Sequence, residues 1–173
     1  TTLGIIGTIG SGKTTLMNLL LKLYTVPNGK IFINNEDINS INLTLLRESI
    51  CYITQDNFLF STTIKDNIIL FRENFEDSEI KQSTEKAMLS DDLTNMKNDI
   101  YTVIGEKGID LSGGQKQRVV ISRAFLNKSN IVIFDDTFSA LDNKTEEQLL
   151  RNIKELVKGK TCIIISNRIS DVK

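Results

Sequence analysis

The stretch GTIGSGKT at residues 7–14 decides the fold of this chain. It fits the pattern G-x-x-x-x-G-K-[ST], a glycine-rich loop whose backbone N–H groups point at phosphate oxygens. Apolar residues 3–6 lead into it as a buried strand does. After it, leucines recur at helical spacing, at Leu16, Leu19, Leu20 and Leu23. A strand, this loop and an amphipathic helix predict a nucleotide site on an α/β fold, with the phosphates at the helix N-terminus.

The loop supplies the predicted nucleotide-binding residues. In this motif Lys13 reaches the β- and γ-phosphates, and the Thr14 hydroxyl ligates Mg²⁺. The alternative, a glycine-rich turn that binds nothing, leaves the flanking strand and helix unexplained. The residues assigned to the nucleotide from this stretch are Gly7, Thr8, Ile9, Gly10, Ser11, Gly12, Lys13, Thr14 and Thr15.

The bulk composition restricts the function classes. With 173 residues, 40% of them hydrophobic and 25% charged, the chain is long enough for one domain with a sizeable core. A formal net charge of -1 excludes the overall basic field that holds nucleic acid. Cys51 and Cys162 lie in strand-like runs, which favours buried thiols in a reducing compartment. No apolar run approaches the ~20 residues of a membrane span, so we expect another domain or chain to supply any span.

Strand and helix patterns alternate along most of the chain. Strands are predicted at residues 30–33, 50–54, 131–134 and 161–166, and helices at 43–47, from 113 onward and at 144–158. Residues 62–96 carry helical patterns without strand runs. This order predicts a largely parallel sheet covered by helices, with a mainly helical block inserted into it.

Polar residues follow two of the predicted strands. Gln55 comes directly after the strand at 50–54, and the apolar strand at 131–134 leads into the carboxylates Asp135 and Asp136. A strand of this kind carries a carboxylate to the edge of the sheet where the phosphate loop lies. The sequence therefore predicts that Asp135 serves a Mg²⁺ ion at the phosphates.

Between these strands lies the run Leu-Ser-Gly-Gly-Gln at residues 111–115. Ser112 is a predicted helix N-cap, and Gln115 three residues later completes a capping box. Two glycines at a helix start expose backbone N–H groups, which suit an anionic phosphate. The alternative is a capped helix with no ligand.

In this order, the phosphate loop, the lone Gln, the Leu-Ser-Gly-Gly-Gln run and the strand ending in Asp resemble the ATP-binding cassette (ABC) ATPases over nearly the whole chain. The resemblance implies an α/β P-loop NTPase core with a largely parallel sheet flanked by helices, plus a mainly helical signature subdomain. We expect the core at about residues 1–61 and 128–173 and the subdomain at about 62–127. The family has further strands on both sides and an upstream aromatic that stacks on adenine, so residues 1–173 are expected to be one truncated nucleotide-binding domain.

The resemblance also assigns roles across a head-to-tail dimer. ATP and Mg²⁺ are the implied ligands, with Thr14, Gln55 and Asp135 at the metal. The resemblance further implies that Gln55 contacts the nucleotide and the attacking water. The implied partner is a second nucleotide-binding domain, whose γ-phosphate the signature of this chain reaches. The residues assigned to that contact are Ser112, Gly113, Gly114, Gln115 and Asp142.

Two positions depart from the family's pattern at the hydrolytic water. Asp136 stands where the family has a Glu that activates water, and Asn167 stands where it has His, in a chain without histidine. The catalytic candidates are therefore Asp136, Gln55 and Asn167. General base catalysis is worth ~10²–10⁴-fold in rate, and Asp is one methylene shorter than Glu. The pattern resembles the slowly hydrolysing half of heterodimeric ABC exporters, so the second domain is expected on a different chain.

Residues 55–68 resemble the stretch that follows this Gln in export-type cassettes. Phe58, Leu59 and Phe60 are expected to line a groove for a helix of a transmembrane domain, and the loop from Gly105 to Gly108 to touch the same domain. The alternative for the three apolar residues is the edge of a packed core. The resemblance implies coupling of ATP to export at the cytoplasmic face of the cell membrane, through an attached transmembrane domain.

Other readings remain open at this point. The chain is alternatively a self-sufficient ATPase, active as a homodimer, or a regulatory cassette without a transport role. Regulatory cassettes that act on ribosomes or DNA carry basic patches or long coiled-coil inserts, and neither is visible in the sequence. A small-molecule P-loop kinase leaves residues 111–115 unexplained.

Overall fold

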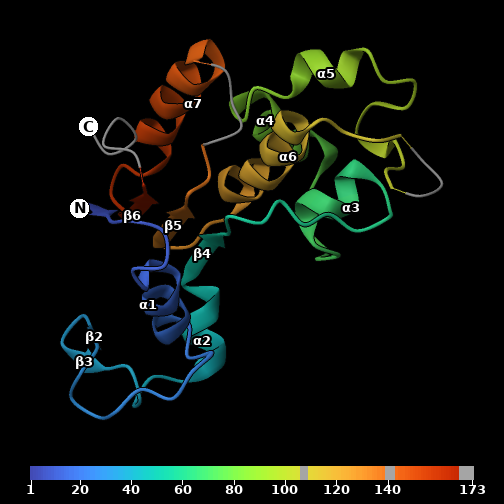
Figure 1. Cartoon of the computed structure of the whole chain (residues 1–173). Coiled ribbons are helices and arrows are strands. Elements are labelled where there is room, and N and C mark those ends of the chain that lie inside the picture. The colour runs from blue at the N-terminus through green and yellow to red at the C-terminus, as the bar shows by residue number, and fades with distance from the viewer. Residues whose placement is uncertain (106–108, 139–142, 168–173) are drawn as a thin grey trace.

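A parallel β-sheet forms the centre of the molecule (Figure 1). The structure, a computed structural model, describes residues 1–105, 109–138 and 143–167. Within these residues the sheet has the strand order β1-β6-β5-β4, and each strand is parallel to its neighbour. The strand bounds are β1 Thr2–Ile6, β4 Ile50–Ile53, β5 Ile131–Asp135 and β6 Thr161–Ser166. Strand β5 is buried along most of its length, as an inner strand with helices on both faces must be. The predicted parallel sheet is confirmed.

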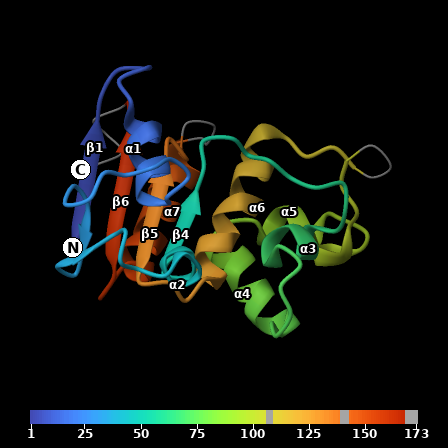
Figure 2. The same cartoon turned by 90° about the horizontal axis from the view of Figure 1, so that it is seen from below.

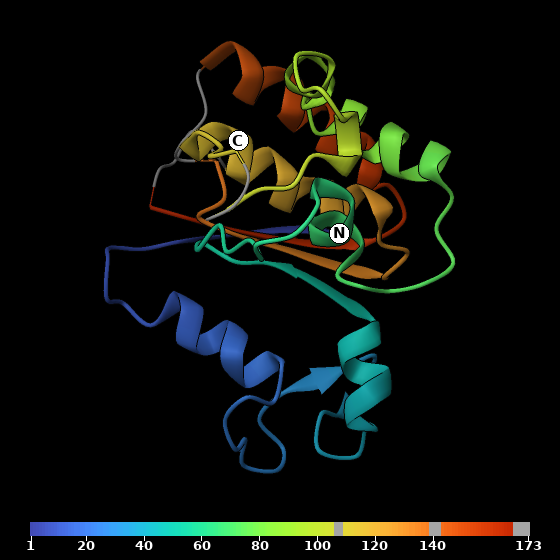
Figure 3. The same cartoon turned by 90° about the vertical axis from the view of Figure 1, so that its right-hand side faces the viewer.

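Helices pack on both faces of this sheet, which Figure 3 shows edge-on. Helices α1 and α2 lie on one face, and α6 and α7 on the other. Their bounds are α1 Lys13–Leu20, α2 Leu43–Glu48, α6 Gly113–Leu126 and α7 Asn143–Leu156. Each face of the sheet has its own hydrophobic core, and successive residues of β5 pack in them alternately. Ile133 packs on the α1 side and Phe134 on the α7 side. The expected layers of an α/β fold are therefore present.

The inward face of α1 differs from the predicted leucine stripe. Met17 is the buried residue of this helix, whereas Leu16 is 45% exposed. The helix ends at Leu20, so Leu23 lies beyond it and is 55% exposed. The predicted amphipathic helix is present, and Leu19 and Leu20 of its leucine stripe are half-buried against the core on the α1 side of the sheet, whereas Leu16 is exposed and the helix ends before Leu23.

Between β4 and β5 the chain forms a group of helices beside the sheet (Figure 2). Their bounds are α3 Ile64–Ile69, α4 Asp77–Lys86, α5 Ser90–Thr94 and the 3-10 helix η1 Asp99–Tyr101. These helices have a core of their own, which contains the fully buried Ile68, Ile80 and Ile100. Helix α6 places Val119 in this core and Val120 in the core of the sheet. It is therefore the element that joins the helical group to the sheet.

A short hairpin lies between α1 and α2. It pairs β2 Phe32–Ile33 with β3 Glu36–Asp37 in antiparallel fashion. Its turn residues Asn34 and Asn35 have φ of 49° and 67°, as a two-residue turn with both central residues left-handed requires.

Candidate functional site

The glycine-rich loop between β1 and α1 closes around its own lysine. Gly10 and Gly12 have φ of 79° and 90°, a region that glycine enters without strain from a side chain. Lys13 Nζ donates hydrogen bonds to the carbonyl oxygens of Gly7 (2.7 Å) and Thr8 (2.9 Å). Because α1 begins at Lys13, its free N–H groups and the positive end of its dipole lie at the same place. The loop therefore offers backbone donors and an ammonium group to an anion.

A buried carboxylate at the end of β5 meets the start of α1. Asp135 is 2% exposed, and its Oδ2 accepts a hydrogen bond from Thr14 Oγ1 at 2.9 Å. The same oxygen accepts a second hydrogen bond from the hydroxyl of Tyr52, on β4, at 2.7 Å. Burial, and then the hydrogen bond to Asp135, raise the pKa of Tyr52, so the phenol remains a donor at neutral pH. Two hydroxyls from different elements thus hold one carboxylate oxygen.

Asp136 has a strained backbone. Its φ of 46° is a left-handed value, uncommon for a residue with a side chain. Its N–H donates to the carbonyl oxygen of Ile165 on β6 at 2.9 Å, which helps to hold this conformation. Gln55 Nε2 donates to Asp136 Oδ2 at 3.4 Å. The structure therefore places two of the three predicted catalytic residues in contact.

These groups surround one hollow of about 280 Å³. Its lining residues are Ile9, Gly10, Ser11, Gly12, Lys13, Thr14, Thr15, Gln55, Asp135, Asp136 and Asn167. Gly7 and Thr8 belong to the same loop and reach the hollow through the amine of Lys13. Larger hollows lie elsewhere, among them two of about 940 and 1000 Å³ beside α2 and α7. Size alone does not select the site, because neither of them contains the glycine-rich loop.

The signature residues lie apart from this hollow, at the start of α6. Ser112 Oγ accepts from the Gln115 N–H at 3.2 Å, and Gln115 Oε1 accepts from the Ser112 N–H at 2.9 Å. The predicted capping box is therefore confirmed. Ser112 and Gly113 are exposed, and Gly114 is half-buried. None of them lines the hollow around Lys13, and Asp142 lies outside the described residues.

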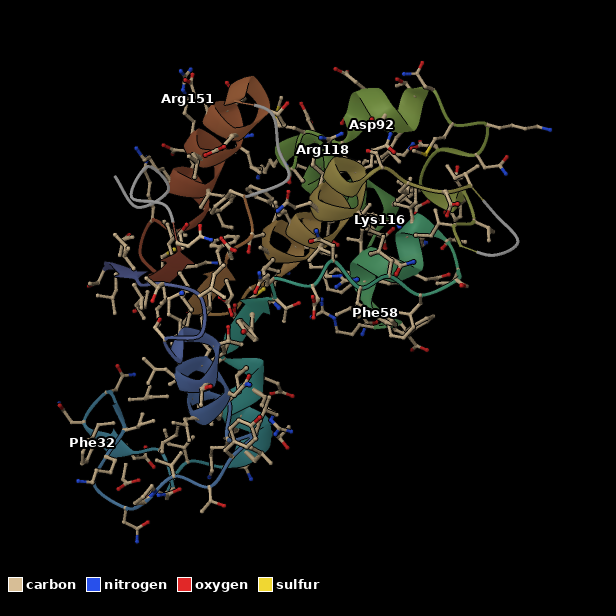
Figure 4. All side chains as sticks on the ribbon, viewed as in Figure 1. Phe32, Phe58, Asp92, Lys116, Arg118 and Arg151 are labelled. Carbon is tan, nitrogen blue, oxygen red and sulfur yellow. The ribbon has the colours of Figure 1, made fainter. Side chains whose placement is uncertain are left out.

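The carboxylate of Asp92, on α5, contacts two side chains near the start of α6. Asp92 Oδ1 accepts from Gln115 Nε2 at 2.8 Å, and Asp92 Oδ2 accepts from Arg118 Nη2 at 2.6 Å. Figure 4 labels Asp92 and Arg118, which extend toward each other from α5 and α6. The carboxylate thus holds two residues of the first turns of α6, one of which is part of the capping box.

Aromatic side chains form an exposed patch after Gln55. Phe58 and Phe60 are 63% and 42% exposed and meet edge-to-face with ring centroids 4.9 Å apart. Phe71, for which the sequence predicts no role, joins this patch, with its ring centroid 5.5 Å from that of Phe60. Leu59 is half-buried against both cores of the sheet and helices. A small hollow of about 200 Å³ brings residues 57–60 next to Gly105, while 106–108 lie outside the described residues.

The oxygen atoms that meet at the end of β5 are suitable ligands for a magnesium ion. A hydroxyl at Thr14 and a carboxylate at Asp135 are the hard oxygen ligands that Mg²⁺ prefers, and Mg²⁺ usually takes one or two carboxylates plus substrate phosphates. Within the ranges described above, no group of three or more His, Cys, Asp or Glu residues could hold a metal by itself. A site that shares its metal with a bound phosphate is therefore the kind that these residues suit.

Sequence reasoning missed Tyr52 and Asp92. Tyr52 lies three residues before Gln55 on a strand whose neighbour carries Asp135, so a search of adjacent parallel strands for hydroxyl donors would have found it. Asp92 gives no such signal, because its partners lie more than twenty residues away on another helix.

Comparisons with known proteins agree with this geometry. The sequence profile described as ABC transporter matches residues 1–139. A putative export ATP-binding/permease protein of Rickettsia typhi (strain ATCC VR-144 / Wilmington) is 45% identical over 170 residues, which are 98% of this chain and 30% of that protein. A probable multidrug resistance ABC transporter ATP-binding/permease protein of Bacillus subtilis (strain 168) is 43% identical over 99% of this chain and 29% of its own length.

A solved structure gives the same result. The structure of a bacterial Atm1-family ABC exporter with ATP bound superposes with a TM-score of 0.93 at 34% identity, covering 99% of this chain and 30% of that one. The chain thus spans about a third of the length of the relatives that it matches. By the profile match and these identities, it belongs to the ABC transporter family, as an ATP-binding domain of the ATPase class.

Proposed function

We propose that this chain binds and hydrolyses Mg-ATP as the nucleotide-binding domain of an ABC exporter. The observation that carries the proposal is the hollow in which the glycine-rich loop, Gln55 and the carboxylates after β5 converge. Relatives named as export ATP-binding/permease proteins support export as the coupled process. In this proposal residues 1–61 and 128–173 form the ATP-binding core, and residues 62–127 form the signature subdomain.

The phosphates of ATP would lie over the loop at residues 7–12. Backbone N–H groups of the loop and of the first turn of α1 donate to the phosphate oxygens. Lys13 Nζ exchanges its carbonyl partners on Gly7 and Thr8 for the β- and γ-phosphates. Thr14, Asp135 and Gln55 would hold Mg²⁺, which would neutralise phosphate charge when bound. The ammonium group is hydrogen-bonded both before and after ATP binds, so the exchange leaves no buried charge unpaired.

Hydrolysis at this site is proposed to be slow. Gln55 and Asp136 orient the attacking water, but their 3.4 Å contact is long for a hydrogen bond and Asp136 is one methylene shorter than Glu. A misplacement of ~1 Å forfeits roughly 10²-fold in rate. Asn167 can donate a hydrogen bond to the γ-phosphate, but its amide does not take up a proton as imidazole does.

A second nucleotide-binding domain, proposed to be on a different chain, forms a head-to-tail dimer with this one. Ser112 and Gly113 are exposed and lie outside the hollow around Lys13, so the Ser112 hydroxyl and the Gly113 backbone are accessible to a nucleotide on another molecule. Ser112 Oγ accepts a hydrogen bond within the capping box, and its O–H proton remains available for a phosphate oxygen. Gly114, Gln115 and Asp142 are assigned to the same contact across a head-to-tail dimer.

Export requires a membrane-spanning portion, which the aromatic patch is proposed to contact. None of the helices that the structure describes is long and apolar enough to cross a bilayer. Phe58 and Phe60 expose large apolar rings beside Gly105, where the loop assigned to the same contact begins, and this surface suits the apolar face of a partner helix. In this proposal the domain lies at the cytoplasmic face of the membrane.

ATP binding tests the proposal directly. In the exporter that carries this domain, with the partner's site disabled, Lys13→Ala removes charge-assisted hydrogen bonds to two phosphates, each worth about 1.5–3 kcal/mol. We expect ATP affinity by titration calorimetry to fall at least about 100-fold. Lys158→Ala is the matched control, because Lys158 is 71% exposed and its ion pair is with an equally exposed glutamate, Glu155. Equal ATP affinity in both variants and the wild type would refute the proposed site.

A further inference from the structure

Tyr52 extends along the α1 face of the sheet toward Asp135. In the parallel pairing of β4 with β5, Tyr52 is opposite Ile133, two residues before Asp135. Ile133 and Asp135 share a face of the strand because side chains alternate. Tyr52 and Ile133 both pack in the core on the α1 side. The phenol ring therefore covers the remaining distance along this face and ends on Asp135 Oδ2, at 2.7 Å.

The two hydroxyls on Asp135 differ in what they can do for a metal. Thr14 donates its proton to Oδ2 at 2.9 Å and keeps lone pairs that can ligate Mg²⁺. Tyr52 donates to the same oxygen from strand β4, and its ring is held in place by half-burial in the apolar core. A hydrogen bond to a carboxylate is short and strong because the acceptor is charged. The phenol therefore restricts how the buried carboxylate can rotate.

We propose that Tyr52 is a positioning residue for the magnesium site: its hydroxyl holds the carboxylate of Asp135 in the orientation that serves Thr14 and the metal. This inference rests on the proposed Mg-ATP site. Hydrogen bonds from the surroundings to a metal ligand orient it and tune its affinity, and their loss typically weakens metal binding ~10- to 100-fold. Tyr52 does not touch the nucleotide hollow, whose lining residues do not include it.

The experiment compares metal-dependent with metal-free nucleotide binding. In the exporter that carries this domain, with the partner's site disabled, Mn²⁺ serves as the spectroscopic probe and its affinity for the ATP complex is measured by electron paramagnetic resonance. We expect Tyr52→Phe to weaken Mn²⁺ binding about tenfold and to leave ATP affinity in EDTA unchanged. Tyr24→Phe, which removes the hydroxyl of a tyrosine 56% exposed, is the matched control and should change neither.

Further variants separate positioning from a purely structural role. In an Asp135→Asn background, Tyr52→Phe should have no further effect on Mn²⁺ affinity, because the charged acceptor is gone. Replacing Tyr52 with 4-aminophenylalanine keeps the ring and a donor, so Mn²⁺ affinity should return to that of the wild type even if the Phe variant is unstable. The inference is overturned if Tyr52→Phe leaves Mn²⁺ affinity unchanged, if it weakens ATP binding equally in EDTA, or if the amino variant fails to restore binding. A wild type that binds no Mg-ATP would instead overturn the proposed function, and this inference with it.

Discussion

Removing the carboxylate of Asp92 should destabilise the protein far more than removing a surface carboxylate. Asp92 Oδ2 pairs with Arg118 Nη2 at 2.6 Å, and the two side chains are only 20% and 13% exposed. Arg118 Nε is buried and has no hydrogen-bond partner among the residues that the structure describes, so Asp92 is the main compensation for that charge. Asp92 Oδ1 also accepts from Gln115 Nε2 at 2.8 Å.

The magnitude follows from what Asp92→Ala leaves behind. Breaking a fully buried pair by removing one partner costs about 3–5 kcal/mol, and the residual exposure of Arg118 reduces this to roughly 2–3 kcal/mol. The lost acceptor of Gln115 adds about 1 kcal/mol. We therefore expect the free energy of unfolding to fall by about 3–4 kcal/mol, equivalent to a Tm lower by roughly 6–16 °C for a domain of this size.

Urea denaturation of the wild type and two variants measures this difference. The control is Glu155→Ala, because Glu155 also pairs at 2.6 Å, with Lys158, but both side chains are 71% exposed. Exposed pairs of this kind contribute ~0–1 kcal/mol. If Asp92→Ala lost no more stability than Glu155→Ala, then the buried pair would not stabilise α6 and the reasoning from burial would be wrong.

Two further predictions concern catalysis and pH. Asp136→Glu combined with Asn167→His should raise ATP turnover about 10- to 100-fold when the partner's site is disabled, and an unchanged rate in a phosphate-release assay would contradict the proposed cause of slow hydrolysis. Hydrogen bonds from the hydroxyls of Thr63 and Thr62 lower the pKa of Asp66. The ionised carboxylate therefore stabilises the fold at pH values above the ordinary Asp pKa of about 4. This contribution is lost as the pH falls through the lowered pKa of the folded state. Asp66→Asn should thus lower the free energy of unfolding at pH 7 but much less at pH 3, and an equal loss at both pH values in urea titrations would contradict this.

Features set by local sequence were predictable. The capping box of Ser112 and Gln115 depends on residues three apart, and the structure has both of its hydrogen bonds. Strand β6 has the predicted bounds, 161–166, because its apolar run ends at polar residues on both sides. The glycine-rich loop could be recognised because its conformation requires glycine at Gly10 and Gly12.

Features set by tertiary contacts were not predictable. The buried face of α1 depends on where the helix lies against the sheet, which spacing does not reveal, so Met17 was missed in favour of leucines. The positive φ of Asp136 arises from the turn after β5 and its bond to β6. Phe71 gives no sign in the sequence that it packs on Phe60, since α3 lies between them.

Helix α6 connects the proposed dimer contact with the proposed membrane contact. Its start presents Ser112, and near its other end Arg123 Nε donates to the carbonyl of Asn67 at 2.9 Å and Arg123 Nη2 to that of Phe58 at 3.2 Å. Burial lowers the pKa of Arg123 to about 10, so the guanidinium is still charged at neutral pH and its carbonyl contacts offset its desolvation. A partner helix that displaced the backbone at Phe58 would remove an acceptor from a half-buried cation unless α6 moved with it. In the proposed exporter, this gives a physical reason for the membrane contact and the signature to shift together.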